Sequence, residues 1–104
     1  VVELETGRWS SYWLDAREPA ALWIPPGLAL GFCAVEPSLV WYKLDQPRHP
    51  ATERVVAWDD PSLSIDWPLQ GPPVLSERDR RGGTLQEVCA ELRDFLRRSE
   101  EDRS

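Results

Sequence analysis

Methionine is absent from the 104 residues of this chain, and histidine occurs only once. A chain that begins Val1-Val2 is therefore expected to be a processed product, an alternative-start product or a fragment. The two cysteines, Cys33 and Cys89, lack a CxxC spacing, so we expect reduced and buried thiols. There is no apolar run of ~18 residues and no charged-then-apolar leader, which predicts a cytoplasmic protein.

The scarcity of histidine and cysteine limits the available chemistry. A metal site needs several converging ligands, and no cluster here has that spacing, so neither a metal nor another cofactor is expected. His49 falls in a predicted polar loop, where a lone histidine is usually solvated. Asp59 and Asp60 are adjacent and would point to opposite faces of an extended chain, which favours a turn or helix-capping role over acid–base chemistry.

Negative charge is concentrated in the first three quarters of the chain. Residues 80–104 hold six basic and six acidic side chains, so residues 1–79, with six basic and twelve acidic, carry the whole net charge of −6. Such an acidic body would repel a nucleic-acid backbone or an anionic membrane. A small anionic ligand stays possible, because a few local cations outweigh net charge at short range.

Ten prolines argue against long helices over most of the chain and favour short strands joined by turns. Turn signals stand at Pro25-Pro26-Gly27, Glu36-Pro37 and Asp59-Asp60-Pro61-Ser62. Apolar runs and alternation predict strands at 8–15, 29–35, 38–44, 54–58 and 63–67, and residues 21–24 form a further short apolar run. This spacing is typical of an all-β sandwich or barrel.

The last quarter of the chain predicts a helix. Thr84-x-x-Glu87 is a capping box. An apolar stripe with helical spacing follows, formed by Leu85, Val88, Cys89, Leu92, Phe95 and Leu96. This helix of about three to four turns either packs on the chain's own β-domain or forms a surface for a partner. Gly82-Gly83 is interpreted as a flexible joint rather than an anion cradle. The chain is predicted to consist of a domain at 1–79 and a linker with helix at 80–104.

Four motifs occur in a fixed order: LWIPPGLALGF at 22–32, WYK at 41–43, ERVVAWDDPSLSIDWPL at 53–69 and VLSERD at 74–79. They resemble the C-terminal half of dTDP-4-dehydrorhamnose 3,5-epimerases, whose pattern reads LWIPxGxAHGF, YK, ExxxxWxDPxxxIxWP and LSxKD. RWSSYWLD also fits the strand that precedes this pattern, so the resemblance covers roughly residues 6–79. Each motif is weak alone, but four in register are a strong signal.

The resemblance implies the C-terminal half of a cupin-type jelly roll with an added helix, in a family of metal-free homodimers. These enzymes epimerise C3 and C5 of dTDP-4-dehydro-6-deoxy-D-glucose on the way to dTDP-L-rhamnose. The family's base is a histidine oriented by an aspartate, and its acid is the tyrosine of the YK motif. Tyr42 matches the acid and Asp79 the orienting aspartate. The cations left to hold the substrate are Lys43, Arg48, Arg54 and Arg78.

Three departures from the family pattern accompany this resemblance. The histidine base belongs to the family's N-terminal half, Leu30 replaces the histidine of the AHG motif, and Pro47-Arg48-His49 replaces an aromatic residue. Trp23, Trp58 and Trp67 match framework positions expected in the core. We therefore expect either part of an epimerase that is inactive without the N-terminal strands, or a non-catalytic relative for nucleotide-sugar binding or oligomerisation.

Overall fold

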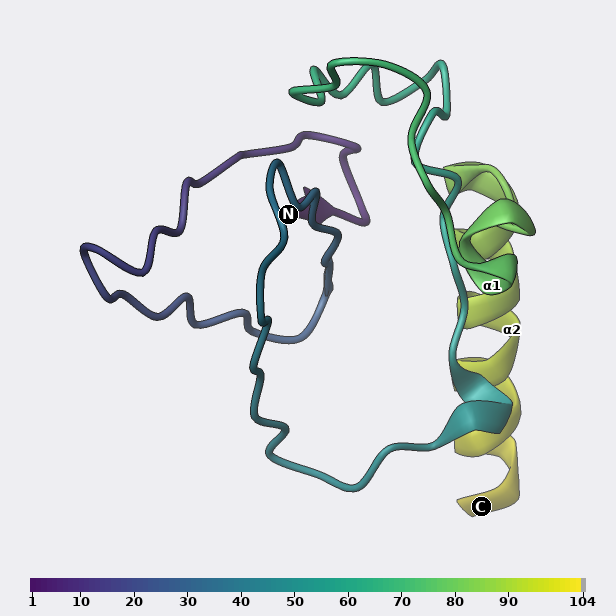
Figure 1. Ribbon diagram of the computed structural model, residues 1–104. Coiled ribbons are helices and arrows are strands. Elements are labelled where there is room, and N and C mark those ends of the chain that lie inside the picture. The colour runs from purple at the N-terminus through teal and green to yellow at the C-terminus, as the bar shows by residue number, and fades with distance from the viewer. Residues whose placement is uncertain (104) are drawn as a thin grey trace.

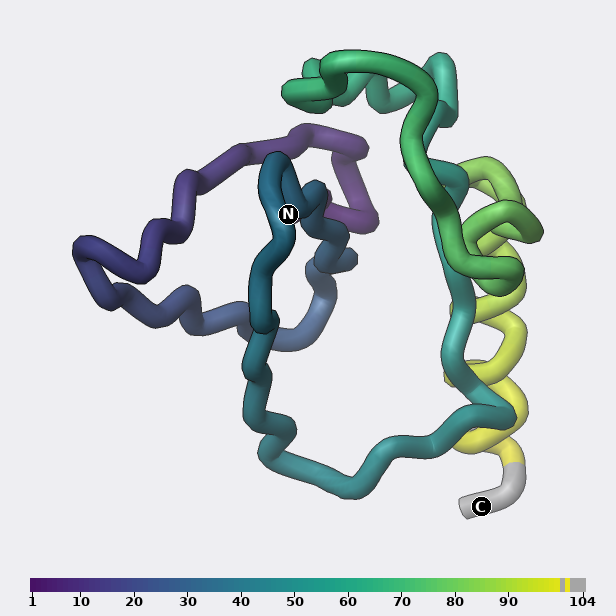
Figure 2. The backbone as a smooth tube through the Cα atoms, in the orientation of Figure 1, coloured from purple at the N-terminus to yellow at the C-terminus, as the bar shows by residue number. Residues whose placement is uncertain are grey.

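The computed structural model describes the backbone of residues 1–103 and the side chains of residues 1–99 and 101. Its regular elements are the strands β1 (Val2–Glu3) and β2 (Leu28–Ala29), the 3₁₀ turn η1 (Pro50–Thr52) and the helices α1 (Glu77–Arg80) and α2 (Leu85–Arg103) (Figure 1). Wide loops built from the first half of the chain lie on one side, and the two helices lie on the other (Figures 1 and 2). The chain is thus mostly non-helical outside its C-terminal quarter.

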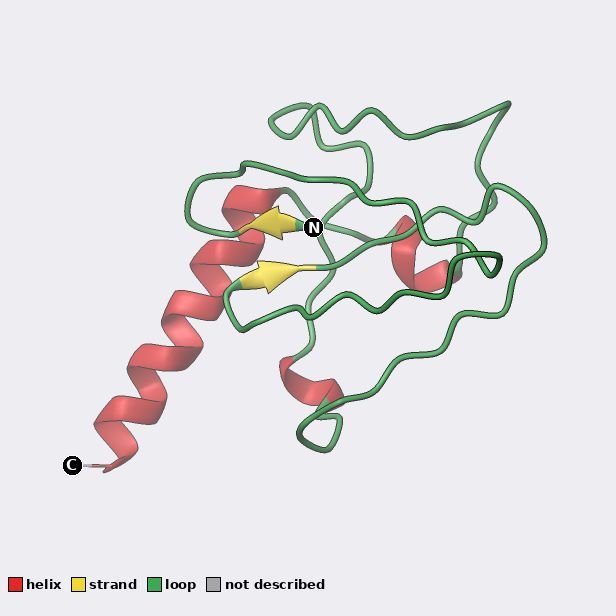
Figure 3. Cartoon of the chain, turned by 90° about the vertical axis from the view of Figure 1, so that its left-hand side faces the viewer, coloured by secondary structure: helices red, strands yellow, loops and turns green. Residues whose placement is uncertain are grey.

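The sheet is much smaller than the sequence predicts. β1 pairs antiparallel with β2, with Val2 opposite Ala29 and Glu3 opposite Leu28 (Figure 3). The predicted strand 29–35 contributes only its first residue, and the other four predicted strands do not form. Alternation of side chains defines the face of a strand, but the strand also needs a neighbour for its N–H and C=O groups. The described chain does not supply those neighbours, so the all-β prediction was wrong for these segments.

The helix prediction is confirmed, and the helix is longer than expected. The N–H of Glu87 donates to Thr84 Oγ1 at 3.2 Å, and the N–H of Thr84 donates to Glu87 Oε2 at 3.4 Å. This reciprocal pair is the predicted capping box. α2 then continues for 19 residues, which is about five turns.

The first half of α2 packs on the rest of the chain. Val88 is buried together with Val2 and Leu63, and Leu85 and Leu92 are half-buried. Further along the same stripe, Phe95 and Leu96 are exposed. The interpretation that the helix packs on its own domain therefore holds for its first two turns, whereas Phe95 and Leu96 beyond them are uncovered.

Gly82 and Gly83 form a close backbone junction, which corrects the prediction of a flexible joint. The N–H of Gly83 donates to Val55 O at 3.0 Å, and the N–H of Ala57 donates to Gly83 O at 2.7 Å. These bonds make a parallel bridge between Val56 and Gly83. A Cβ atom at Gly82 would lie 2.8 Å from the N and Cα atoms of Ala57, so only glycine allows this approach.

Asp60 fixes the start of α2 from the other side. Its buried carboxylate accepts a hydrogen bond from the N–H of Leu85 at 2.7 Å, and from the N–H and hydroxyl of Ser62, both at 2.9 Å. These hydrogen bonds, the one from Leu85 foremost, lower the pKa of Asp60. The capping role predicted for this aspartate pair is thus confirmed for Asp60, which caps a helix 25 residues further along the chain.

We expect Asp60→Ala to lower the free energy of unfolding by about 2–3 kcal/mol, because hydrogen bonds to a buried charged group and a helix cap are both lost. Urea unfolding followed by circular dichroism at 222 nm measures this effect. Asp59→Ala, at the exposed neighbouring position, is the matched control. Equal losses in the two variants would show that Asp60 has no special role.

The same contact makes stability depend on pH. The pKa of Asp60 is lower in the folded chain than its ordinary value of 3.8. The stabilisation is therefore present above about pH 4, and it is lost as the pH falls through the lower, folded pKa. Asp60→Asn should flatten this acid limb of the stability curve, whereas Asp59→Asn should leave it in place.

Candidate functional site

The two residues of the YK motif lie on an irregular and solvent-exposed segment. Tyr42 is 68% exposed, and Lys43 is also exposed. Neither residue is in a regular element, since the predicted strand 38–44 does not form. Their position in the chain matches the motif, but their side chains are not enclosed by other described residues.

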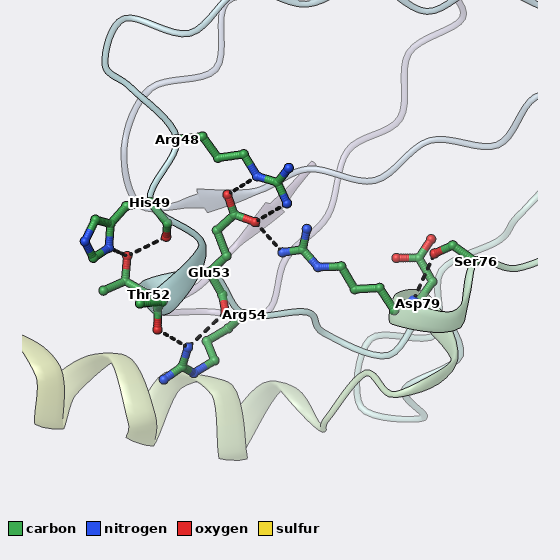
Figure 4. A network of polar contacts seen from close by, with 9 residues as sticks. Arg48, His49, Thr52, Glu53, Arg54, Ser76 and Asp79 are labelled. Carbon is green, nitrogen blue, oxygen red and sulfur yellow. Dashed lines mark hydrogen bonds and ion pairs between the residues drawn. The ribbon is translucent and has the colours of Figure 1, made fainter.

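Glu53 connects two arginines that come from different parts of the chain. Arg48 binds it through two hydrogen bonds, Nε to Oε1 at 2.7 Å and Nη2 to Oε2 at 3.1 Å. Arg78 donates from Nη2 to Oε2 at 2.6 Å. The contact between Arg48 and Glu53 is visible in Figure 4. The hydrogen bond from Arg48, followed by that from Arg78, lowers the pKa of Glu53.

Asp79 is held by the short helix α1. Ser76 is the N-cap of α1, and its hydroxyl accepts a hydrogen bond from the N–H of Asp79 at 3.1 Å (Figure 4). Arg78 precedes Asp79 on the same turn and reaches Glu53. The backbone of Asp79 is thus fixed by the cap, and its neighbour ties α1 to the 48–54 segment.

The structure brings together part of the predicted site. Hydrogen bonding to Glu53 and the charge of its carboxylate raise the pKa of Arg48. Hydrogen bonds therefore join Arg48, Glu53 and Arg78 into one set, and Arg78 is next to Asp79 in the sequence. Among the described residues, no hydrogen bond joins Tyr42 to this set or to Asp79.

Arg54 points away from this set and toward α2. Its Nε donates to Glu91 Oε2 at 2.5 Å. Its Nη1 donates to Ala51 O at 3.2 Å and to Glu53 O at 2.9 Å (Figure 4). An open groove of about 610 Å³ lies here between the 53–55 segment and the helices. Three arginines and four glutamates line the groove, for a net charge of −1, which does not suit a diphosphate.

The lone histidine makes only local contacts in the described structure. His49 Nδ1 lies 3.0 Å from Thr52 Oγ1, which in turn donates to His49 O at 3.1 Å (Figure 4). Leu30, at the position of the lost histidine, is exposed. Among the described side chains, those of residues 1–99 and 101, no three from His, Cys, Asp or Glu converge on a metal-sized site.

The three framework tryptophans do not share one environment. Trp58 and Trp67 are half-buried, and Trp67 Nε1 donates to Trp58 O at 2.8 Å. Trp23 is 81% exposed, so the prediction that it belongs to the core was wrong. The apolar run at 21–24 has no facing layer among the described residues, which leaves this indole in solvent.

Glu53 is the residue that sequence reasoning missed. It is the first residue of the ExxxxWxDP motif, and no role was predicted for it. A carboxylate five residues after Arg48 is a sequence signal for this pair, but the contact with Arg78 bridges 25 residues. That contact depends on where α1 docks, which local spacing does not predict.

Comparison with known proteins identifies the family. The sequence profile of the family described as dTDP-4-dehydrorhamnose 3,5-epimerase matches residues 4–87. A protein of that name from Pseudomonas aeruginosa is 44% identical over 77 residues, 73% of this chain and 42% of the relative. The Neisseria gonorrhoeae protein is 43% identical over 79 residues, 75% of this chain and 24% of the relative.

A Mycobacterium tuberculosis relative of the same name is 36% identical over 87 residues, 81% of this chain and 43% of the relative. The chain therefore spans less than half the length of these curated relatives. No solved structure matches it. Within the described residues, no helix is both long and apolar enough to cross a membrane. With the profile matched over residues 4–87, the chain belongs to the dTDP-4-dehydrorhamnose 3,5-epimerase family.

Proposed function

We propose that this chain supplies the acid-bearing half of a 3,5-epimerase for dTDP-4-dehydro-6-deoxy-D-glucose, and that it acts together with further strands of the family fold. The observation that carries the proposal is the family match over residues 4–87, inside which Tyr42 and Asp79 keep their places in the motifs. Relatives that share these motifs are named for this reaction. The proposed product class is the deoxysugar nucleotides of dTDP-L-rhamnose biosynthesis.

The chemistry fits a protonated tyrosine opposite a base. The 4-keto group of the substrate acidifies the C–H bonds at C3 and C5, so a base on one face of the sugar can remove a proton and leave an enolate. An acid on the other face then returns a proton and inverts the centre. The phenol O–H of a tyrosine is a proton donor, and we assign this role to Tyr42.

Asp79 is assigned to the orientation of the base. A carboxylate that accepts a hydrogen bond from an imidazole fixes its tautomer and its direction. The capped turn of α1 gives Asp79 a defined backbone position for this purpose. The base itself is a residue that the chain does not provide, because Leu30 carries no proton acceptor and the ring of His49 contacts Thr52 in a surface turn.

The cationic side chains have different prospects as ligands of the substrate diphosphate. Lys43 follows Tyr42 directly in the sequence, and Arg48 is six residues after Tyr42. We assign both cations to the diphosphate. Arg48 must exchange its contact with Glu53 for a phosphate, and Arg54 would have to leave Glu91.

We further propose that residues 1–79 form part of a jelly roll that completes a homodimeric, cytoplasmic enzyme, with residues 80–104 as an added helical segment.

Adding the missing part of the fold tests this function. The chain is mixed with a recombinant polypeptide comprising the part of the Pseudomonas aeruginosa relative that its match does not cover. NMR in D₂O then follows deuterium entering C3 and C5 of the substrate. We expect exchange in the mixture, and a loss of about 10²–10⁴-fold on Tyr42→Phe, the usual contribution of general acid–base catalysis. Tyr12→Phe, at the other tyrosine of the chain, is the control and should retain the exchange.

A second candidate is a non-catalytic relative that binds a nucleotide sugar or serves in oligomerisation. Leu30 favours it, as do the ion pairs that occupy Arg48 and Arg54. Under this alternative the mixture binds dTDP-sugars in calorimetry, but it exchanges no deuterium, and Tyr42→Phe changes nothing. Exchange that depends on Tyr42 would exclude it.

A further inference from the structure

Arg54 binds the backbone of the turn that precedes it. Its Nη1 donates to Ala51 O, which belongs to η1, at 3.2 Å. The same nitrogen donates to Glu53 O at 2.9 Å (Figure 4). The side chain of Arg54 is 38% exposed, against 60% for that of Arg48. A guanidinium used in this way fixes the backbone that it contacts, because its N–H groups form a rigid planar fork.

The same guanidinium is also anchored on α2. Its Nε donates to Glu91 Oε2 at 2.5 Å, a contact that joins residues 37 positions apart. Glu91 lies between Val88, which is buried, and Leu92, which is half-buried, so it belongs to the docked part of the helix. α2 is therefore a support for Arg54, and Arg54 connects this support to the turn.

The turn has fewer other restraints than the helix. Its own backbone hydrogen bonds stay within residues 49–53. Among the described residues, those at 31–48 before it make no backbone-to-backbone hydrogen bond. The helix start, in contrast, is held by the carboxylate of Asp60 and by the backbone bridge at Gly83. Loss of the ion pair between Arg54 and α2 should therefore loosen the turn more than the helix.

We propose that Arg54 is a positioning residue, which fixes the turn at residues 49–53 to α2. Through this turn it keeps the carboxylate of Glu53 in reach of Arg48 and Arg78. Glu53 is the last residue of the turn, and the two arginines donate to its carboxylate at 2.7 Å and 2.6 Å. A displacement of the turn would therefore disturb both contacts at once.

This role replaces a direct contact between Arg54 and the substrate diphosphate. It rests on the proposed function in one respect, the assignment of Arg48 to that diphosphate. The family match ends at residue 87, and Glu91 lies beyond it. The support for a predicted substrate contact thus comes from a part of α2 outside the matched region.

NMR titration of the Glu53 carboxyl group tests this role on the full 104-residue chain. Hydrogen bonds from Arg48 and then Arg78 lower the pKa of Glu53, so this pKa reports whether both arginines are in place. Arg54→Lys keeps the positive charge, but an ammonium group lacks the planar fork of the guanidinium. Glu91→Ala removes the anchor and places a strong helix former on α2. In both variants we expect the pKa of Glu53 to rise toward its ordinary value of 4.5.

The direction of the shift separates positioning from a change of charge. Glu91→Ala removes a negative charge from the groove that Glu53 also lines, and this alone would lower the pKa of Glu53 further. Arg54→Lys leaves the charge as it is. A rise in both variants therefore reports that Glu53 has lost its alignment with the two arginines. The amide groups of the turn should also exchange about two- to fivefold faster, in line with the contribution of an exposed ion pair.

Asp94→Ala is the matched control on the same helix. It removes another exposed ion pair of α2, between Asp94 and Arg97 at 3.4 Å. The pKa of Glu53 should stay as it is in this variant. Amide exchange in the first turns of α2 should stay slow in all three variants, because the other contacts of the helix start remain.

Several outcomes would overturn the proposal. One is a pKa of Glu53 that is unchanged or lower in Arg54→Lys and Glu91→Ala, and another is an equal rise in Asp94→Ala. A third is a rise accompanied by fast exchange in the first turns of α2, which would assign the ion pair to the docking of the helix. If the pKa rises as expected but the mixture exchanges no deuterium into substrate, only the proposed function is refuted, because the titration needs no substrate.

Discussion

The isolated chain should exchange deuterium into C3 and C5 of dTDP-4-dehydro-6-deoxy-D-glucose no faster than protein-free solution. Proton removal beside a ketone needs a base within about 3 Å of the carbon-bound proton. His49 lies in a surface turn against Thr52, and the other histidine position is Leu30. Loss of the base alone removes about 10²–10⁴-fold, and loss of the binding groups removes more.

NMR in D₂O with protein in excess over substrate measures this rate. The rate with the free chain is compared directly with the rate in the mixture that also contains the polypeptide of the Pseudomonas aeruginosa relative. Exchange by the free chain well above background, abolished by Tyr42→Phe and retained by Tyr12→Phe, would contradict the expectation. In that case Asp79 would have to reach the sugar and act as the base itself.

Gly82→Ala should detach α2 from the rest of the chain. The added Cβ would lie 2.8 Å from the N and Cα of Ala57 and 3.0 Å from the carbonyl carbon of Val56. These are backbone atoms, so they cannot rotate away as a flexible side chain would. Gly82 does not have a positive φ, and alanine is therefore acceptable for its own backbone. The strain arises from the close approach alone, and we expect a loss of about 3 kcal/mol.

Gly71→Ala is the matched control, because a Cβ there meets nothing within 4 Å. Its effect on unfolding should stay within about 0.5 kcal/mol, as for most surface changes. Urea unfolding at 222 nm and amide exchange in the first turns of α2 report on both variants. If Gly82→Ala and Gly71→Ala behaved alike, the junction at Gly82 would be adaptable and the flexible-joint prediction would be restored.

The features that the sequence predicts correctly are those with local causes. Thr84 and Glu87 are three residues apart, and their reciprocal bonds form wherever a helix starts. Asp60 and Ser62 likewise form their turn within a few residues. The stripe on α2 follows from helical periodicity, although how far the chain covers it, up to Leu92 but not Phe95, depends on tertiary packing.

The strands failed for the opposite reason. Alternation at 38–44 indicates which side chains share a face, but pairing depends on a second strand, which can be distant in sequence. The described chain offers only β1 for β2. The pattern at 38–44 therefore indicates a tendency to form a strand, but it does not predict whether a partner strand is present.

The site was predictable at the level of position rather than contact. The motif registers identified Tyr42 and Asp79, and those assignments remain proposals. The pairing of Glu53 with Arg48 and Arg78, and the turn of Arg54 toward Glu91, depend on how α1 and α2 dock on the 48–54 segment. No spacing rule in one sequence predicts such docking.

The bridge between Val56 and Gly83 has a consequence for proteolysis. It closes the intervening residues into a loop whose two ends are fixed to each other and to α2. Among the described residues, those at 31–48 make no backbone-to-backbone hydrogen bond. Lys43 is exposed in this stretch, whereas the side chain of Arg48 binds Glu53. Brief treatment with trypsin should therefore cut first after Lys43 and leave the piece from residue 44 onward with its clamped helix. Protease resistance would thus divide the chain within the epimerase motifs, between WYK and ERVVAW, rather than at the glycine pair before α2.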